Sequence, residues 1–596
     1  MVWIGNNVFY HKGREIRDKV AHIFLKDGEQ SNITVFADID APEGIEAKIL
    51  TDVGTFGNVW RSIPMKPVER VNHLIRHKAI IPVTQNEVFD MLLNITDGTT
   101  SIFQNEIHCP DTDGDRRVVV SPEPTKNHTI YSVCPRTFAA TEKDGKFVSG
   151  TFKSVTEDLE YIKSLGTTVL YMLPFQLPST FRDLTRPGNL GSIYCIRDHF
   201  SINPELGTKK DLQELVETAH NLDMLVITDM VCNHTGFDHL WTKEHPEWYF
   251  VVDGKVQPAS EGERVWEDCA QLNFKEQIPE LWEAIASITP YWMNEVGIDG
   301  VRLDASQKLP LDLLKIINNR AKLVKQNSFI MGETLCPLPL IKTIPLDATY
   351  VSFYWLTNEA ANAHKFTKYV QDVAECVPDQ LPMMVFTENH DVPSKKWAHI
   401  GTWAPETMIS KWESKHLGGD FSLAKKKMLQ CELINRTISG PTLNFLPMMY
   451  QGTEYGEPWR GHFMDPKIAD GTVNALHREY RVDEHHRDLV QSFQRLDSML
   501  KEYSFLRSGE VHYLTDGIFD NNVLAYLKSS AEGSALVVCN LFRRPQKVQI
   551  SLDQSSRNYI FSELLSGNLH GIYPTDAGVE LNLDSVDSRI LLLETI

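Results

Sequence analysis

Acidic residues stand at the ends of four apolar segments, each time close to arginine, glycine, asparagine or histidine. The segments are 227–234 (ITDMVCNH), 300–304 (GVRLD), 330–333 (IMGE) and 386–391 (FTENHD). One acidic residue at a strand end is more often a helix cap, so no single segment is convincing alone. Carboxyl groups that end neighbouring strands, however, can act together, one as a nucleophile or base and the other as a proton donor. Together the four segments indicate a catalytic site built from several carboxyl groups.

Apolar runs alternate with amphipathic helix patterns from about residue 128 to residue 500. The clearest of these patterns predict helices over 156–165 and 209–222. Eight apolar runs with helices between them predict an α/β fold, a (β/α)8 TIM barrel. In such a barrel the reactive groups lie where strands end and loops begin, which is where the four acidic segments fall. The predicted strands are 129–133, 168–173, 224–229, 300–303, 329–332, 349–353, 383–387 and 443–450.

Shorter alternating runs precede and follow the predicted barrel. Runs such as 32–37 and 88–93, separated by turn-rich segments, predict an N-terminal β-sandwich. Short strands return after Ser508 and predict a C-terminal antiparallel β domain. The expected domains are 1–125, 126–505 with a short loop domain at about 233–277, and 506–596.

The composition excludes several classes of protein. The chain has 596 residues, of which 42% are hydrophobic and 23% charged, as in ordinary globular proteins. Because 79 acidic residues outnumber 59 basic ones, the net charge of -20 repels nucleic acid and anionic lipid surfaces, and we expect neither as a partner. We find no signal-peptide pattern, no apolar run of about 18 residues and no CxxC spacing among the nine cysteines. These features predict a cytoplasmic protein with reduced thiols.

In their order along the chain, the four segments resemble the motifs of the α-amylase family of retaining glycoside hydrolases and transglycosidases. Those motifs are D-x-x-x-N-H, G-x-R-x-D, a glutamate that closes the fifth strand, and N-H-D after the seventh. Two further stretches, 191–208 and 440–454, are similar to the family's segments before the second helix and at the eighth strand. With both flanking β domains, the resemblance to this family (glycoside hydrolase family 13) spans nearly the whole chain.

The resemblance implies roles for seven residues. Asp304 would be the nucleophile, Glu333 the acid/base and Asp391 the stabiliser of the transition state. The four remaining residues would bind substrate, the tyrosine by stacking on a sugar ring. They are Arg302, His390, His234 and Tyr194.

Arg302 and Glu333 also carry expectations from the physical chemistry of the site. Arg302 lies two residues before Asp304 and so faces the same side of the strand, where its positive charge would keep Asp304 ionised. Glu333 must hold a proton near neutral pH, which burial beside other carboxylates would favour. Asp229 matches a motif position that is usually structural, and we assign it no chemical role.

Many members of the family bind Ca²⁺ beside the loop domain, and this sequence departs from their ligand pattern. Asn233 is present, but Gln271 stands where an acidic residue precedes the Leu-Asn pair. Lys308 stands where a histidine supplies a backbone carbonyl, and its ammonium group would repel a divalent cation. We therefore expect no metal at this site, and we expect no other cofactor.

The sequence predicts an intracellular enzyme that acts on α-glucans or maltooligosaccharides and cleaves mainly α-1,4 bonds through a covalent glycosyl-enzyme. One alternative is a transglycosidase such as a maltosyltransferase that uses maltose-1-phosphate, because segments 245–248 and 332–334 are somewhat similar to that branch. It would require a phosphate pocket, and we identify none in the sequence. A second alternative is a non-catalytic amylase-like scaffold, which the complete set of three carboxylates disfavours. The oligomeric state is left open, with a homodimer among the choices.

Overall fold

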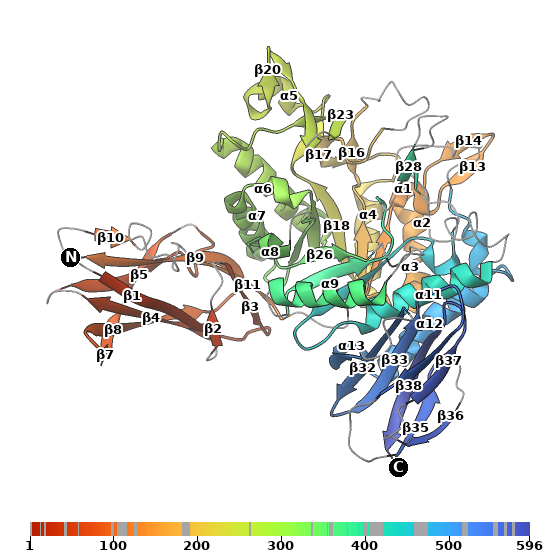
Figure 1. Cartoon of the computed structure of the whole chain (residues 1–596). Coiled ribbons are helices and arrows are strands. Elements are labelled where there is room, and N and C mark those ends of the chain that lie inside the picture. Colours follow the sequence, from red (N-terminus) through yellow and green to blue (C-terminus); the bar gives the residue numbers. More distant parts are fainter. Residues whose placement is uncertain are drawn as a thin grey trace.

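A computed structural model gives the arrangement of the chain in three parts, an N-terminal pair of sheets, a central barrel and a C-terminal pair of sheets (Figure 1). The described residues are 3–11, 14–16, 20–40, 45–57, 59–96, 101–103, 116–123, 128–180, 191–261, 264–334, 338–341, 343–353, 356, 362–377, 380–391, 394–396, 403–405, 421–457, 475–514, 522–551, 558–565, 569–574 and 579–595.

The N-terminal part is a sandwich of two sheets that share one apolar core. Alternate residues of β4 are buried, and side chains such as Ile33 and Val35 from this sheet meet Leu93 and Val118 from the other. The first sheet has the order β2 (Arg14–Ile16), β1 (Trp3–His11), β4 (Ser31–Asp40), β8 (Leu74–Val83), β7 (Lys66–Val71). The second has the order β3 (Val20–Leu25), β11 (Arg116–Pro122), β9 (Glu87–Thr96), β5 (Glu46–Thr51), β6 (Arg61–Pro64), with β10 (Ser101–Phe103) beside β9.

Eight parallel strands form the central barrel. In chain order they are β12 (Ile130–Val133), β15 (Val169–Met172), β18 (Leu225–Val231), β24 (Gly300–Asp304), β25 (Phe329–Gly332), β26 (Thr349–Ser352), β27 (Pro382–Phe386) and β30 (Asn444–Tyr450). The ring closes because β30 pairs with β12, and a bridge between Met331 and Ala348 joins β25 to the segment that enters β26. Each strand begins and ends within two residues of its predicted range, and the predicted fold class is confirmed.

Alternation along the strands decides which side chains enter the barrel. In β24, Val301 and Leu303 belong to the core between the strands and the surrounding helices. Because successive side chains of a strand point to opposite faces, Arg302 and Asp304 project into the barrel. The interior is otherwise filled by residues such as Tyr171 and Met331, so it is a packed core with its polar groups gathered at one end.

Helices cover the outside of the barrel. The predicted helix 209–222 is α4, which begins at a capping box formed by Thr208 and Asp211. The predicted helix 156–165 corresponds to the shorter α3, and a separate short helix, α2, ends where the predicted range begins. The helices are α1 (Pro135–Phe138), α2 (Phe152–Thr156), α3 (Leu159–Ser164), α4 (Lys209–Asn221), α6 (Pro279–Val296), α7 (Leu311–Val324), α8 (Leu338–Ile341), α9 (Ala363–Cys376), α11 (Phe421–Thr437), α12 (Arg487–Glu502) and α13 (Phe505–Ser508).

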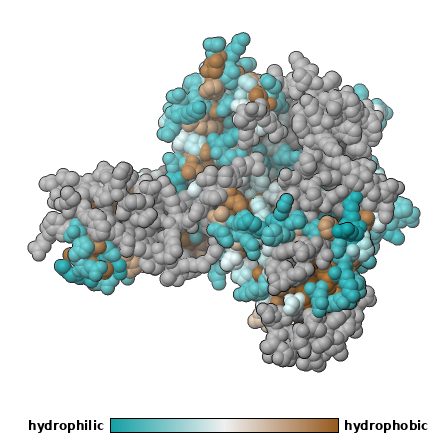
Figure 2. Space-filling view, viewed as in Figure 1, coloured by the Kyte–Doolittle hydropathy of each residue, from teal (hydrophilic) through white to brown (hydrophobic). Residues whose placement is uncertain are grey.

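A small loop domain lies between β18 and α6, at the top of Figure 1. Its main sheet has the order β19 (His234–Gly236), β23 (Arg264–Gln271), β22 (Pro258–Glu261), and it also holds α5 (Trp241–Glu244), β20 (Val251–Val252) and β21 (Lys255–Val256). Figure 2 shows hydrophobic residues among hydrophilic ones at its tip. The large exposed hydrophobic side chains of this domain are Leu240, Phe250, Val251, Val252 and Val265.

The C-terminal part is antiparallel and packs against α9 and α13 through β32. Its larger sheet has the order β31 (Glu510–Tyr513), β32 (Val523–Ser530), β33 (Gly533–Asn540), β38 (Ser588–Thr595), β35 (Asn558–Glu563), β36 (Leu569–Pro574), and β34 (Gln546–Ile550) pairs with β37 (Val579–Leu583). Three small hairpin-like pairs lie in the loops of the barrel: β13 (Thr141–Lys143) with β14 (Lys146–Val148), β16 (Gln176–Pro178) with β17 (Ile196–Ile202), and β28 (Ser394–Lys396) with β29 (Trp403–Pro405).

None of the helices within the described ranges is both long enough and apolar enough to cross a membrane.

Buried polar contacts fasten the N-terminal sandwich to α7 of the barrel. Lys315 Nζ lies 2.6 Å from Asp52 Oδ2 and 2.7 Å from Asp90 Oδ2. Next to this ion pair, Asn319 donates to the carbonyl of Val88 and accepts its N–H, so a helix side chain completes the edge of β9. The N-terminal sandwich and the barrel are therefore joined by buried polar groups. If one of these groups loses its partner, water cannot take the partner's place.

We expect Lys315→Met to lower the free energy of unfolding by about 3–5 kcal/mol, because it leaves the buried carboxylate of Asp52 without its cation, whereas Asp90 keeps its ion pair with Arg117. Urea unfolding followed by circular dichroism measures the change. Lys368→Met is the matched control, since Lys368 pairs with Asp372 on the exposed face of α9 and such pairs contribute about 0–1 kcal/mol. Equal destabilisation by the two variants would contradict the assigned role of Lys315.

Candidate active site

The guanidinium group of Arg302 joins carboxylates from three neighbouring strands. Its Nη1 donates to both carboxylate oxygens of Asp229, at 2.8 and 2.7 Å, and to Asp304 Oδ1 at 3.0 Å. Its Nη2 lies 2.6 Å from Glu333 Oε2. The ladder register explains this meeting, because Arg302 of β24 lies opposite Asp229 of β18 and Met331 of β25. One buried cation thus sets the positions of Asp304 and Glu333.

Asp304 is held from its other side by the loop that follows β18. Asn233 Nδ2 donates to the backbone carbonyl of Asp304 at 3.0 Å and to its Oδ2 at 3.2 Å. The next residue, Ala305, has φ 44° and ψ 45°, in the left-handed region. For a residue other than glycine this conformation costs about 1–3 kcal/mol and is concentrated at functional sites. It turns the chain so that the Ala305 N–H donates to Glu333 Oε2 at 2.9 Å.

Glu333 follows β25 directly and accepts hydrogen bonds at both carboxylate oxygens. Its Oε2 receives Arg302 and Ala305, and its Oε1 receives the hydroxyl of Tyr350 at 2.9 Å. Burial, with the nearby Glu333 charge, raises the pKa of Tyr350 far above its ordinary value, so this hydroxyl keeps the proton that it donates. A side chain at Gly332 would lie within 2.7 Å of Ser306 Oγ and Leu346 Cδ1, so only glycine allows β25 to approach these neighbours.

Asp391 reaches this group through His390 and Tyr194. The Tyr194 hydroxyl donates to Asp229 Oδ2 at 3.0 Å and lies 2.7 Å from His390 Nε2. Because the single hydroxyl proton goes to Asp229, His390 Nε2 is the donor to the tyrosine oxygen. The same nitrogen lies 3.1 Å from Asp391 Oδ2, and the Asp391 side chain is 59% exposed. Asp391 therefore stands at the open side of the group, whereas Asp304 and Glu333 lie deeper.

His234 links the loop after β18 to the backbone of Tyr194. Its Nε2 lies 3.1 Å from the Tyr194 carbonyl oxygen and its Nδ1 lies 2.6 Å from Asn233 Oδ1. Burial lowers the pKa of His234 to about 4, so the ring is neutral near pH 7 and donates through one nitrogen. In this structure both ring nitrogens contact protein atoms, and contact with a sugar by His234 stays a prediction.

The structure brings all seven predicted residues into one connected group, and it joins to them four further residues, of which the two tyrosines were absent from the sequence analysis. The four are Asp229, Asn233, Tyr171 and Tyr350. Asp229, given no chemical role, is fully buried and accepts from Arg302, Tyr194 and the Tyr171 hydroxyl at 2.6 Å. The sequence did offer a signal for Asp229, because an aspartate inside an apolar strand is buried and therefore needs hydrogen-bond or ionic partners. Tyr171 and Tyr350 gave no signal, because tyrosine is ordinary in a buried strand.

Arg302 lowers the pKa of Asp304, as expected, but other effects outweigh it. Burial raises the pKa of Asp304 well above its ordinary value, and the Glu333 charge adds to this effect. Arg302 lowers the pKa of Asp304 by less, because its one positive charge also faces Asp229 and Glu333.

The residues at the family's calcium position do not fit a calcium ion. Asn233 Oδ1 faces His234 Nδ1, and its amide nitrogen faces Asp304. Gln271 brings no charge, and Lys308 Nζ lies 4.0 Å from the centre of the Trp266 ring and donates to the Ser260 carbonyl. Ca²⁺ needs six to eight oxygen ligands, several of them carboxylates. The chemistry proposed for this site therefore uses the side chains alone.

We expect treatment with EDTA, followed by gel filtration, to shift the midpoint of thermal unfolding by no more than about 1 °C, because no carboxylate cage at this position depends on Ca²⁺. Differential scanning fluorimetry with EDTA and with millimolar CaCl₂ measures the shift. A stabilisation that saturates with one equivalent of Ca²⁺ would contradict the interpretation.

The raised pKa of Asp304 also predicts how stability depends on pH. A carboxyl group that binds its proton more tightly in the folded state loses stability as pH rises through the folded pKa. The asparagine side chain cannot ionise, so Asp304→Asn should be more stable than wild type near pH 8, and the difference should shrink as pH falls toward 4. Urea unfolding between pH 4.5 and 8 tests this, with the exposed substitution Asp372→Asn as control. A difference that is constant with pH would refute the assignment.

Comparisons with known proteins agree with this architecture. Residues 132–397 match the family model described as alpha amylase, catalytic domain. The maltogenic alpha-amylase of Bacillus acidopullulyticus is 22% identical over 479 residues, which cover 73% of this chain and 73% of that protein. The alpha-1,4-glucan:maltose-1-phosphate maltosyltransferase of Picrophilus torridus is 24% identical over 442 residues, which cover 71% of this chain and 62% of that protein.

Solved structures show the same fold. The alpha-amylase from Geobacillus thermoleovorans, complexed with acarbose, aligns with a TM-score of 0.60 at 20% identity over 79% of this chain and 98% of that one. A cyclomaltodextrinase aligns with a TM-score of 0.61 at 18% identity over 98% of this chain and 99% of that one. The second alignment covers nearly the whole chain, flanking β parts included.

Proposed function

We propose that this chain, whose residues 132–397 match the model of the alpha amylase catalytic domain, is an enzyme that cleaves α-glucosidic bonds, mainly α-1,4, with retention. The proposal rests on one observation: a single buried guanidinium holds Asp304 and Glu333 side by side at the carboxyl ends of β24 and β25. Retaining cleavage needs two carboxyl groups about 5–5.5 Å apart, one as nucleophile and one as acid. The names of the relatives, maltogenic amylase and cyclomaltodextrinase among them, support an α-glucan as substrate. The intracellular location remains a prediction from the composition.

In the proposed reaction Asp304 attacks the anomeric carbon while Glu333 protonates the leaving oxygen. The product is a glycosyl ester of Asp304, which water then hydrolyses with Glu333 as base. Asp391, at the open side of the site, would face the sugar and favour positive charge at the anomeric carbon. His390 and Tyr194 position Asp391, because they connect it to the buried Asp229.

Asp304 and Glu333 must be in the right protonation states before Asp304 attacks the sugar. Asp304 must lose its proton to become a nucleophile, and Glu333 must hold one to act as acid. Burial and the Glu333 charge, which raise the pKa of Asp304, oppose its ionised form. Arg302 Nη1 and Asn233 Nδ2 then stabilise the Asp304 anion, since both already donate to its oxygens.

A maltosyltransferase that uses maltose-1-phosphate is the second candidate. Two relatives carry that name, from Picrophilus torridus at 24% identity and from Arcanobacterium haemolyticum at 26% identity. The covalent step on Asp304 would be the same. The leaving group would be phosphate, and the acceptor a sugar hydroxyl in place of water.

We expect Asp304→Asn and Glu333→Gln each to lower kcat/KM on maltooligosaccharides at least about a thousandfold, because each removes a group that bonds or protonates only in the transition state. Asp391→Asn should lower kcat more than it raises KM. The assay follows labelled maltooligosaccharides, with and without maltose-1-phosphate, by chromatography. Glu276→Gln, exposed in the segment before α6, is the matched control.

The products and the covalent intermediate separate the candidate functions. Shorter sugars alone indicate a hydrolase, whereas longer sugars with release of inorganic phosphate indicate the maltosyltransferase. A fluorinated glycosyl fluoride should leave a sugar on the tryptic peptide 303–308, which contains Asp304. Full activity of Asp304→Asn on every α-glucoside tested would refute both candidates.

A further inference from the structure

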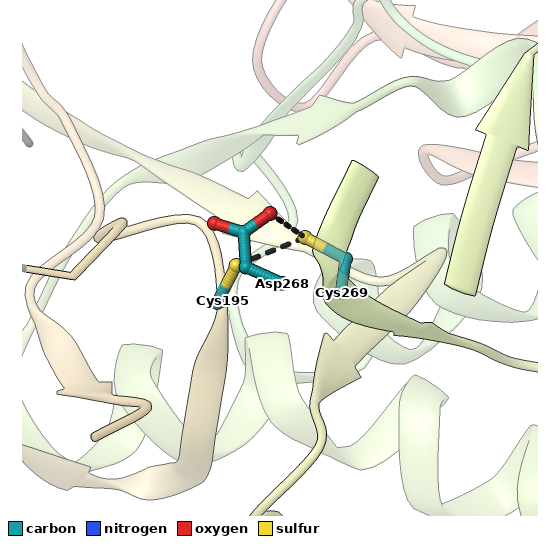
Figure 3. A group of neighbouring side chains, drawn as sticks. All are labelled: Cys195, Asp268 and Cys269. Carbon is teal, nitrogen blue, oxygen red and sulfur yellow. Dashed lines mark hydrogen bonds between the residues drawn. The ribbon is translucent and has the colours of Figure 1, made fainter. Parts of the chain in front are cut away.

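Two cysteine side chains meet beside the candidate site, where the barrel touches the loop domain. Cys195 Sγ lies 2.9 Å from Cys269 Sγ, and Cys269 Sγ lies 3.7 Å from Asp268 Oδ1 (Figure 3). The two cysteines are 1% and 4% exposed, whereas Asp268 is half-buried. Within the described ranges, Cys195, Cys269 and Asp268 form the group of potential metal ligands that the structure brings together.

A β-bulge in β23 explains why the carboxylate of Asp268 lies beside the thiol of the next residue, Cys269. In a regular strand Asp268 and Cys269 would point to opposite faces. Ala270 pairs with Pro258 and Trp266 pairs with Ala259, so residues 267–269 of β23 have no partner on β22. Such a bulge re-aims side chains. On its other edge β23 pairs with β19 without a register shift, and Cys269 lies opposite Gly236. This pairing fixes the backbone that carries the thiol.

The number of ligands, and not the separation of the sulfurs, distinguishes a zinc site from a disulfide at this pair. A tetrahedral zinc ion with bonds of about 2.3 Å holds two sulfurs about 3.7 Å apart, which is wider than the observed 2.9 Å. A disulfide requires about 2.05 Å, and the thiols need only close on each other to reach it. A structural zinc site uses four ligands, whereas the described residues bring three together here, one of them a half-buried carboxylate, so the pair fits a disulfide better.

We propose that Cys195 and Cys269 are a redox modification site, and that oxidation joins them in a reversible disulfide that fastens the loop domain to the segment carrying Tyr194. Cys195 follows Tyr194 in the chain, and Cys269 lies in the strand that pairs with His234–Gly236. The contact of His234 with the Tyr194 carbonyl already spans this junction, and the disulfide would make it covalent. The inference does not depend on the catalytic assignment.

The oxidation balances with a peroxide as oxidant. One thiolate attacks hydrogen peroxide, which breaks the O–O bond and gives a sulfenic acid and water after protonation. The second thiol attacks the sulfenic sulfur, forms the S–S bond and releases a second water. In sum, two thiols and one hydrogen peroxide give one disulfide and two waters, and a dithiol reductant reverses the change by exchange.

Asp268 acts on the rate of this reaction. The contact with Cys195, together with burial, raises the pKa of the Cys269 thiol well above its ordinary value, and the Asp268 charge adds to the effect. Because the thiolate is the reactive form, the carboxylate slows oxidation at neutral pH. Removal of this charge should therefore speed disulfide formation without any change in the two sulfurs.

The disulfide also closes a covalent loop from residue 195 to residue 269, which contains β17, α4, β18 and most of the loop domain. A link of this kind restrains the unfolded chain. We expect the oxidised protein to unfold about 2–5 °C higher than the reduced protein.

The test uses the full chain, reduced and then treated with hydrogen peroxide, blocked with N-ethylmaleimide and digested with trypsin. The expected product is peptide 183–197 joined to peptide 265–275, two hydrogens lighter than the sum of the two, and absent after treatment with dithiothreitol. Cys195→Ser and Cys269→Ser should each abolish it and the increase in unfolding temperature. Cys376→Ser, a cysteine of α9, is the matched control and should change neither.

Two further measurements keep the inference falsifiable if a serine variant folds poorly. Asp268→Asn retains both cysteines and should form the linked peptide several-fold faster than wild type at pH 7. Zinc chloride added to the reduced wild-type chain should bind at less than one equivalent. Peptides that remain separately alkylated after peroxide, an unchanged rate in Asp268→Asn, or stoichiometric zinc held by the two cysteines would each overturn the proposal.

Discussion

The buried guanidinium of Arg302 is the constraint on which the rest of the site depends. One positive charge inside the barrel faces three carboxylates, so the carboxylate lone pairs that it does not satisfy need other donors. Tyr171 and Tyr194 donate to Asp229, Asn233 donates to Asp304, and Tyr350 donates to Glu333. These donors come from different strands or from the loops that follow them, which is why the site requires the closed barrel.

The same arrangement opposes stability. The three carboxylates carry two more negative charges than Arg302 balances. Burial and this excess charge together raise the pKa of Asp304. Ala305 adds a left-handed backbone, held in place because its N–H has Glu333 as partner. A large core between strands and helices, and flanking sheets fastened through contacts such as that of Lys315, offset the stability that the site loses.

The loop domain completes the open side of the site. His234 begins its first strand and contacts the backbone of Tyr194, and Cys269 in the neighbouring strand contacts Cys195. The position of Tyr194 therefore depends on how firmly the loop domain sits on the barrel. A chemical change at the cysteine pair would act on the same junction.

The sequence by itself determined the barrel, because each strand is a local apolar run and its hydrophobic pattern does not depend on the partner strand. It also located Asp304, Glu333 and Asp391, since motifs of fixed spacing place them at strand ends. Only the tertiary structure decided which groups surround them. Asp229 meets Arg302 through the register of two strands that are 73 residues apart at that point, Tyr350 enters from a third strand, and the two cysteines meet through a bulge. The raised pKa of Asp304 likewise follows from its burial and from the Glu333 charge on the neighbouring strand, and neither effect has a counterpart in local sequence.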